Sequence, residues 1–292
     1  MKKSITSNWR PLLHALYPFL IASAVLSAMP RNARAQPLYV TNRPENGAGV
    51  VSEYNATTGA VINASFITGL NDPTLLAVSG NTLFQANAHG NTVGKYDATT
   101  GGAINPGFIT GLQQPVGLAL LGDELFVTNK TTGTVGKYDA TTGATINANF
   151  ITGLNGSTGL ALRGNTLFVA NAGDGTVGAY NATTGAPIKV PFITGLREPV
   201  GLALFGNKLF VANFVISTVG EYDAKTGAAI NANFITGLFF PEGLALLGNK
   251  LFVANNQNGT VGEYDAKTGA AINANFITGL SLPFGIAVKS AK

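Results

Sequence analysis

The sequence predicts an all-β fold, a β-propeller of six four-stranded blades. Three observations carry this prediction: a repeated motif, a turn-rich repeat unit that is typical of propellers in length, and the way the two chain ends complement each other. The motif is Leu-aromatic-Val-Ala-Asn or a close variant, and it begins at Leu38, Leu83, Leu125, Leu167, Leu209 and Leu251. The last four intervals are equal, and the first is slightly longer. A period of roughly 40 residues with several short strands per unit is typical of propellers.

One repeat unit, taken from Gly201, accommodates four short strands and no helix. The expected strands are residues 201–204, 209–213, 218–222 and 232–236. The turn before the fourth strand is Asp223-Ala-Lys-Thr-Gly227. Asp in such a turn bonds its own backbone two residues on, and Gly supplies a positive φ. We expect the first two strands to be innermost, because they are apolar at successive positions. The third and fourth carry polar residues and are expected to be more exposed.

The two chain ends favour a closed ring over a linear solenoid. The first repeat starts at its second strand, residues 38–42, with no Gly-Leu-Ala-Leu run before it. The chain ends on a lone first strand, residues 285–288, with no partner after it. A solenoid requires polar capping units at its ends, and the sequence has none. We therefore expect the C-terminal strand to complete the N-terminal blade, which removes two exposed sheet edges.

The first 35 residues have the organisation of a secretory signal peptide. Lys2 and Lys3 precede an apolar run over residues 12–28, and Ala33-Arg34-Ala35 supplies an A-x-A cleavage site. The alternative is a membrane anchor, but Pro18 interrupts the run, and a spanning helix needs roughly 20 apolar residues. We expect cleavage after Ala35. The mature chain is then a single domain of residues 36–292, secreted or periplasmic, without a membrane span.

Removal of this segment changes the charge of the chain. Five of the 18 Lys and Arg residues lie in it, whereas all 14 Asp and Glu residues lie beyond it. The mature chain therefore has thirteen basic and fourteen acidic residues, a formal charge of −1. Without a basic excess, no nucleic-acid partner is expected. The chain has no cysteine, so we expect it to fold without disulfides. We also expect it to be a monomer.

The two loop faces of the expected ring differ in how much the repeats vary. On the uniform face, every turn between the third and fourth strands follows the pattern Tyr-Asp/Asn-Ala-Thr/Lys-Thr-Gly. The varied face carries the loop that enters each first strand and the loop that joins the second and third strands. The Asn that ends each motif is constant, and we expect it to bond the turn backbone. Binding sites concentrate on varied loops held by a rigid scaffold, although neutral drift is an alternative interpretation.

The candidate ligand-binding residues lie in these two kinds of loop on the varied face. They are Arg43, Glu45, Asp72, His89, Gln114, Lys130, Asp174, Arg197, Glu198, Phe214, Phe239, Phe240 and Glu242. Asp72 and Glu198 are three repeats apart, so we expect them to face each other across the channel mouth. Phe239 and Phe240 are expected either to form an apolar contact patch or to plug the channel. His89 is the only histidine of the mature chain, and no catalytic residue is assigned.

The repeat unit resembles a known family of propeller repeats. Its consensus reads Pro-x-Gly-Leu-Ala-Leu, then Gly-Asn-x-Leu-Phe-Val-Ala-Asn, then Thr-Val-Gly-x-Tyr-Asp-Ala-x-Thr-Gly. This pattern resembles the NHL and YVTN-type repeats of secreted bacterial propellers, and residues 39–42 spell the latter motif. The resemblance covers the chain from about Leu38 to Val288. It implies the fold more than an activity, because such propellers host binding proteins, lactonases and lyases.

A more distant resemblance is to the six-bladed gluconolactonase-like hydrolases, which hold a calcium ion in the channel. It implies Asp72, Glu198 and Glu242 as metal ligands, with the ion polarising a lactone carbonyl and activating water. That family's ligand pattern does not match residue by residue, and Gly156 and Phe240 offer no ligating side chain. Lyases of similar repeat type need a histidine and acid pair, for which His89 alone is weak support.

Three hypotheses about function follow from the sequence. The leading one is a secreted, non-catalytic propeller that binds an unknown protein, peptide or glycan through its varied face, with no cofactor expected. The second is a calcium-dependent, lactonase-like hydrolase with the metal at the channel mouth. The third is a structural envelope component without a discrete site.

Overall fold

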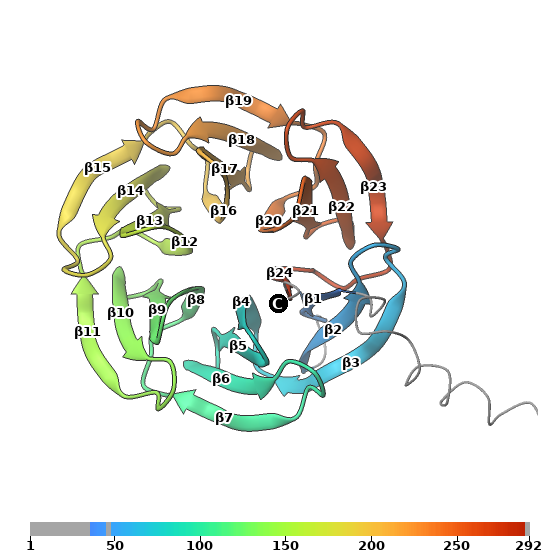
Figure 1. Ribbon diagram of the computed structural model, residues 1–292, viewed down its shortest axis with the longest axis horizontal. Coiled ribbons are helices and arrows are strands. Elements are labelled where there is room, and N and C mark those ends of the chain that lie inside the picture. Colours follow the sequence, from blue (N-terminus) through green and yellow to red (C-terminus); the bar gives the residue numbers. More distant parts are fainter. Residues whose placement is uncertain (1–35, 45–47, 290–292) are drawn as a thin grey trace, which may run out of the picture. The chain divides into compact units, whose positions relative to one another are not determined.

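The computed structural model describes residues 36–44 and 48–289. In these ranges the chain forms 24 β-strands and no helix, arranged in six four-stranded antiparallel sheets. Figure 1 shows the sheets as six blades around a central axis. The predicted six-bladed propeller is therefore confirmed. Two predictions, the signal peptide at residues 1–35 and the candidate Glu45, lie outside the described residues. Within the described part of the chain, no helix has the length and hydropathy to cross a bilayer.

Each blade runs from a first strand beside the axis to a fourth strand at the periphery (Figure 1). The first strands are β24 (Ile286–Val288), β4 (Pro73–Ser79), β8 (Pro115–Leu121), β12 (Ser157–Arg163), β16 (Pro199–Phe205) and β20 (Pro241–Leu247). The second strands are β1 (Pro37–Asn42), β5 (Thr82–Asn87), β9 (Glu124–Asn129), β13 (Thr166–Asn171), β17 (Lys208–Asn213) and β21 (Lys250–Asn255). The third strands are β2 (Gly49–Asn55), β6 (Thr92–Asp97), β10 (Thr134–Asp139), β14 (Thr176–Asn181), β18 (Thr218–Asp223) and β22 (Thr260–Asp265). The fourth strands are β3 (Val61–Leu70), β7 (Ala103–Ile109), β11 (Thr145–Ile151), β15 (Pro187–Ile193), β19 (Ala229–Ile235) and β23 (Ala271–Ile277).

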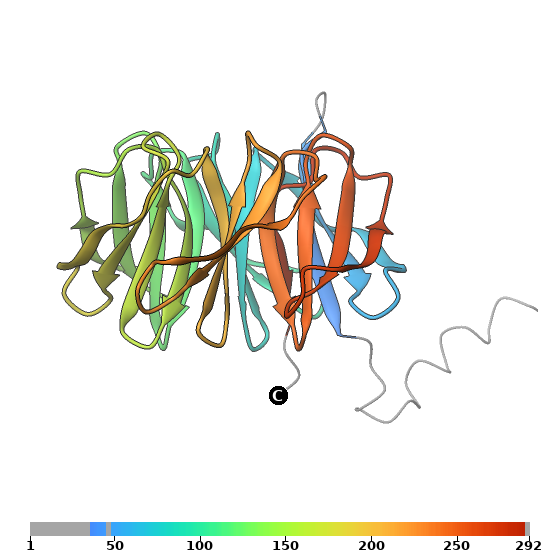
Figure 2. The same cartoon turned by 90° about the horizontal axis from the view of Figure 1, so that it is seen from above.

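The ring closes in the way the chain ends predict. The sheet of the first blade has the order β24-β1-β2-β3, so its innermost strand comes from the C-terminus. β24 pairs antiparallel with β1, with Leu38 opposite Val288 and Val40 opposite Ile286. Strand ends and connecting loops gather on two opposite faces of the ring (Figure 2). Closure gives every first strand a neighbour on each side.

The core lies between neighbouring blades. Six apolar clusters occupy the six interfaces, and one of them joins Phe168 of β13 to Leu209 and Tyr222 of the next blade. Burying one such large apolar side chain contributes roughly 1.5–3 kcal/mol of transfer free energy. The repetition of this packing around the ring stabilises the whole domain.

The third strands are more buried than the sequence predicts. In β18, Thr218 to Tyr222 are all buried, whereas in the fourth strand β19 the first five residues are exposed and the last two are buried. The tyrosine of this strand explains the difference. Its ring folds back over Gly220, where an added Cβ would meet the Tyr222 ring at 2.7 Å, and it packs against the neighbouring blade. The prediction of an exposed fourth strand is correct, and that of an exposed third strand is wrong.

Close approach of the first strands to one another requires glycine. A Cβ built at Gly201 of β16 would lie 2.1 Å from the main-chain oxygen of Glu242 in β20, far inside any contact distance. Equivalent glycines stand in β8, β12 and β20, and their added Cβ atoms would meet the next blade's main chain at 2.1–2.4 Å. These glycines set how narrow the channel is, and therefore how close the residues around its mouth come to each other.

Candidate functional site at the channel mouth

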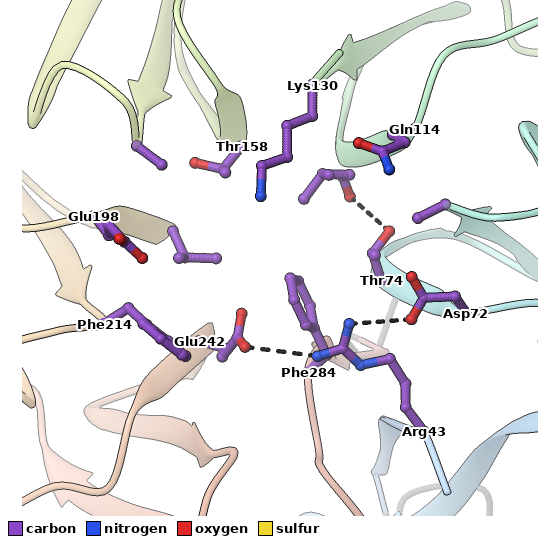
Figure 3. A pocket seen from close by; sticks show the side chains of 14 residues that line it. Arg43, Asp72, Thr74, Gln114, Lys130, Thr158, Glu198, Phe214, Glu242 and Phe284 are labelled. Atoms are coloured by element: carbon purple, nitrogen blue, oxygen red, sulfur yellow. Dashed lines mark hydrogen bonds and ion pairs between the residues drawn. The ribbon is translucent and has the colours of Figure 1, made fainter. Parts of the chain in front are cut away.

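A pocket of about 290 Å³ lies at the mouth of the channel on the varied face (Figure 3). Residues of all six blades line it, and all 14 come from three positions that recur once in every repeat. The position before the first strand supplies Asp72, Gln114 and Glu198. The second position of the first strand, or its equivalent, supplies Thr74, Val116, Thr158, Val200, Glu242 and Phe284. The position after the constant asparagine supplies Arg43, Ala88, Lys130, Ala172 and Phe214.

The structure brings together seven of the residues that the sequence suggested. Arg43, Asp72, Gln114, Lys130, Glu198, Phe214 and Glu242 line one pocket. In Figure 3, Asp72 and Glu198 lie on opposite sides of it, as expected for residues three repeats apart. The other described candidates do not line it, namely His89, Asp174, Arg197, Phe239 and Phe240. That these residues bind a ligand stays a prediction.

Sequence reasoning missed the small and apolar residues of the pocket. Thr74, Thr158, Val116 and Val200 belong to the same repeat position as Glu242. A signal for them was present, because stepping back from Glu242 by one repeat at a time reaches each of them. Ala88 has no functional group on its side chain, so nothing in the sequence distinguishes it as a lining residue from its neighbour His89.

The pocket floor is apolar. Val116, Val200 and Phe284 form a buried cluster to which Leu75 and Phe214 add partly buried side chains. Because these residues come from different blades and contact one another, they meet across the axis. Phe239 and Phe240 do not belong to this cluster or to the residues that line the pocket.

Phe239 and Phe240 instead lie beside the pocket, where they form an apolar surface with Phe214, Val215 and Ile216 that we call the apolar lip. The Phe240 ring stacks on the Phe214 ring, with centroids 4.7 Å apart and planes at 27°. Phe239, Val215 and Ile216 are each about half exposed, at 48%, 50% and 47%. That these residues form an apolar contact patch stays a prediction.

Arg43 is held inside the pocket by acidic and aromatic groups. Its Nη1 lies 3.1 Å from Oδ1 of Asp72 and its Nη2 lies 3.7 Å from Oε1 of Glu242. Its Cζ is 4.3 Å from the centroid of the Phe284 ring, a cation–π distance. The guanidinium therefore lies between Asp72 and Glu242 (Figure 3), and its charge is already compensated by the protein.

Glu242 is a buried carboxyl group with an unusual pKa. The residue is 5% exposed, and its only close charged partner among the described residues is Arg43 at 3.7 Å. Burial raises its pKa to about 8, since desolvation disfavours the charged form. The cations of Arg43 and Lys130 oppose this rise, whereas Asp72 and Glu198 add to it. At neutral pH the protonated form of Glu242 is therefore favoured in the free pocket.

Two charged side chains at the pocket rim are free to bind. The side chains of Lys130 and Glu198 make no hydrogen bond or ion pair with any described residue. Their main chains hold the loops, since Lys130 N donates to Gln114 O at 3.1 Å and Phe214 N donates to Glu198 O at 3.2 Å. Figure 3 shows both side chains directed toward the pocket opening from different blades.

The position before each first strand has a left-handed backbone in all six blades. Five of the six residues there are not glycine, with φ of 53° at Asp72, 52° at Gln114, 48° at Glu198, 49° at Phe240 and 44° at Leu282. Gly156 occupies the sixth, with φ of 62°. A non-glycine residue in this region costs roughly 1–2 kcal/mol. The chain retains side chains at the rim where glycine would be less strained, and such strain is common at functional sites.

The remaining candidates lie outside the pocket. His89 Nε2 is 3.7 Å from Oδ2 of Asp72, but its side chain is 67% exposed. Asp174 accepts a hydrogen bond from Nδ2 of Asn155 at 2.7 Å. Arg197 is exposed on the same face.

The donors suggested for calcium do not form a ligand set. Among the described residues, no three His, Cys, Asp or Glu side chains come together in a group that suits a metal ion. The Arg43 cation also lies between Asp72 and Glu242, where it would repel a divalent ion. The described donors therefore do not fit the expected site, and calcium binding stays a prediction.

Three of the constant asparagines, Asn129, Asn213 and Asn255, bond the loop backbone as expected, whereas Oδ1 of Asn42, Asn87 and Asn171 has no hydrogen-bond partner among the described residues. Asn129 Oδ1 accepts a hydrogen bond from the main-chain N of Gln113 at 3.1 Å, and Asn255 Oδ1 accepts one from Phe239 N at 3.3 Å. In five of the six repeats Nδ2 also donates to the threonine that starts the third strand, for example Thr134 at 3.3 Å, and in the first repeat Asn42 Nδ2 donates to Ser52 Oγ. Asn129, Asn213 and Asn255 thereby join the two loops of the varied face and so support the pocket rim.

Comparison with known proteins supports the fold. A chain of the nidogen/laminin complex superposes with a TM-score of 0.76 at 14% identity, covering 88% of this chain and 99% of that one. The computationally designed Ika8 protein superposes with a TM-score of 0.55 at 18% identity, covering 87% and 74%. No protein-family model and no curated protein sequence matches the chain. At these identities the similarity shows a β-propeller and nothing finer.

Proposed function

We propose that this protein is a secreted, non-catalytic binding propeller of the NHL/YVTN type that holds its ligand in the channel-mouth pocket. The pocket itself carries the proposal. Its lining comes from repeat positions that vary in chemistry, and two of its charged side chains have no partner among the described residues. A concave site with an apolar floor and a few polar groups is the usual form of a ligand site.

Two further observations support binding over drift. The strained backbone at Asp72, Gln114 and Glu198 keeps polar side chains at the rim at a cost in stability. A neighbour of the same fold occurs in a complex of nidogen with laminin, so propellers of this shape engage protein partners. A protein, peptide or glycan that inserts one group into the pocket is consistent with the apolar lip beside it.

The calcium-dependent hydrolase has weaker support. It needs Asp72, Glu198 and Glu242 around one ion, and Arg43 lies between two of these three. His89 pairs with Asp72 only loosely and from outside the pocket.

The proposal is tested by a binding screen with a blocked pocket. Glycan fragments, short peptides and small metabolites are screened against residues 36–292 by thermal shift, and each hit is measured by calorimetry. Ala172→Trp fills the rim, whereas Ala228→Trp places the same side chain on an exposed loop of the uniform face. We expect Ala172→Trp to abolish binding and Ala228→Trp to preserve it. Hits that survive Ala172→Trp, or a screen without hits, contradict the proposal.

A further inference from the structure

We infer that the ligand group held in this pocket is a small zwitterion of amino-acid size, with its ammonium toward Glu198 and its carboxylate toward Lys130. This inference rests on the proposed function and specifies the ligand chemistry of the same site. It follows from which charges in the pocket are already compensated and which are not.

The first step is the charge that remains after internal pairing. Arg43 and Asp72 neutralise each other at 3.1 Å, so neither offers a free charge to a ligand. Lys130 and Glu198 have no such partner among the described residues. One cation and one anion are therefore left, and a ligand that carries one charge of each sign satisfies both.

The second step is the position of these charges. Glu198 and Glu242 come from neighbouring blades, and the Phe214 ring lies beside them (Figure 3). The carboxylate of Glu198 next to an aromatic ring favours an organic ammonium, and the protonated Glu242 beside it adds no opposing positive charge. Lys130 reaches into the opening from a different blade than Glu198 and Glu242, the blade that also carries Gln114 (Figure 3). An ammonium and an amide N–H are donors that suit a carboxylate.

The third step is size and polarity. A volume of about 290 Å³ corresponds to about ten water molecules at roughly 30 Å³ each, which suits a small molecule or one residue. Val116, Val200 and Phe284 form the floor, so the body of the ligand is apolar. Lys130 disfavours a simple organic cation, and the acidic groups disfavour a simple anion. A zwitterion with an apolar side group meets all three conditions.

The test uses three probes that share one apolar body. Phenylalanine carries both charges, phenethylamine lacks the carboxylate and 3-phenylpropionate lacks the ammonium. Binding to residues 36–292 is measured by calorimetry at one pH and low salt. We expect phenylalanine to bind at least about tenfold more tightly than either partial analogue, since a hydrogen bond to a charged group contributes about 1.5–3 kcal/mol.

Two substitutions assign each charge to a side chain. Lys130→Met is expected to remove the advantage of phenylalanine over phenethylamine and to keep its advantage over 3-phenylpropionate. Glu198→Gln is expected to remove the advantage of phenylalanine over 3-phenylpropionate and to keep its advantage over phenethylamine. Lys225→Met on the uniform face and Asp174→Asn outside the pocket serve as controls and are expected to change neither ratio.

The outcomes separate the inference from the proposed function. Equal binding of phenethylamine and phenylalanine to the unmodified protein, or equal loss of all three probes in both variants, overturns the zwitterion. If none of the three probes binds, but another screened ligand binds the unmodified protein and not Ala172→Trp, the proposed pocket function is supported and the zwitterion is wrong. If no ligand at all responds to Ala172→Trp, the proposed function fails as well.

Discussion

The uniform and varied faces of the ring make similar tight turns but use their side chains differently. On the uniform face, Asp223 Oδ1 accepts hydrogen bonds from the main-chain N of Lys225 at 3.0 Å and of Thr226 at 2.8 Å. On the varied face, the loops are held by main-chain bonds, as when Phe214 N donates to Glu198 O, and by the constant asparagines, so the side chains of Lys130 and Glu198 take no part in closing them. A side chain that is needed to close its own turn stays constant between repeats. A side chain that is not needed there is free to serve a ligand.

The same contrast appears in the acid–base behaviour of the two faces. Hydrogen bonds from backbone N–H groups lower the pKa of Asp97, Asp139, Asp223 and Asp265 on the uniform face. Burial instead raises the pKa of Glu242 in the pocket. The aspartates of the uniform face therefore stabilise the fold when they are charged. Ionisation of Glu242 on the varied face instead destabilises the fold. The predictions below test this division, in order of decreasing effect on stability.

The largest effect on stability is expected where neighbouring first strands pack against each other, because this packing holds the ring together and also positions the pocket residues. Gly201→Ala places a Cβ 2.1 Å from Glu242 O and must push β16 and β20 apart. Overpacking of this kind costs about 3 kcal/mol, which lowers the melting temperature by roughly 6–12 °C in a domain of this size. Gly107→Ala is the control, because its Cβ would have only an ordinary contact at 3.6 Å with Thr110. Equal melting temperatures for both variants would show that the first strands tolerate a wider channel.

Glu242→Gln is expected to stabilise the protein at pH 8. Because the folded pKa of about 8 is higher than the ordinary value of 4.5, the folded state binds more protons than the unfolded state between these values. Stability therefore falls as pH rises through this window, and glutamine removes that loss. We expect a gain on the order of 2 kcal/mol at pH 8 and little change at pH 4.5. Denaturant unfolding at both pH values checks it, with the rim variant Glu198→Gln as control. Parallel pH profiles for Glu242→Gln and the unmodified chain would contradict the raised pKa.

Asp223→Ala is expected to lower the melting temperature by about 2 °C at pH 7, without an effect on ligand binding. The folded pKa of Asp223 is lowered by bonds from the backbone N–H groups of Thr226 and Lys225. Its contribution is therefore present above the ordinary pKa of 3.8 and is lost as pH falls through the lowered value. Asp223→Asn is the matched control, since Asn181 makes the same two bonds at 2.9 Å in another blade. A melting temperature for Asp223→Asn as low as that for Asp223→Ala would argue against the turn bonds as the cause.

The smallest effect on stability is expected at the pocket rim. Glu198→Gly relieves the left-handed backbone at φ of 48° and reproduces the residue of the equivalent position in another blade, Gly156. We expect the melting temperature to stay the same or to rise by about 1–2 °C, while affinity for a pocket ligand is lost. Thermal unfolding and calorimetry on the same sample measure both. A clear loss of stability would mean that Glu198 has a structural role. It would contradict the statement that side chains of the varied face are not needed for the fold.

Much of the fold could be predicted because it depends on patterns that repeat along the chain. The regular repeat period, the turn at Asp223 and the lone strand at residues 285–288 each constrain the nearby backbone, and together they require a closed ring. The prediction was wrong for the third strand. There the burial depends on how the Tyr222 ring folds over Gly220 and meets the next blade, which polarity alone does not indicate.

The pocket was predicted only in part. Loop position identified Arg43, Lys130 and Glu198 as residues of one face, because equivalent loops of a propeller meet at the same end. It also selected His89 and Asp174, which lie one or two residues beyond the pocket-lining position. Successive side chains along the backbone point in different directions. A prediction that is wrong by one residue in a loop therefore selects a side chain that points away from the pocket.

The sequence by itself therefore determined the ring, its closure and the division into a uniform and a varied face, since these follow from patterns that repeat along the chain. Only the tertiary structure decided which side chains share the channel mouth. The pairing of Arg43 with Asp72, the burial of Glu242 and the freedom of Lys130 depend on distances across the axis. Those distances are set by how closely the glycine-bearing first strands pack, and no local pattern encodes them.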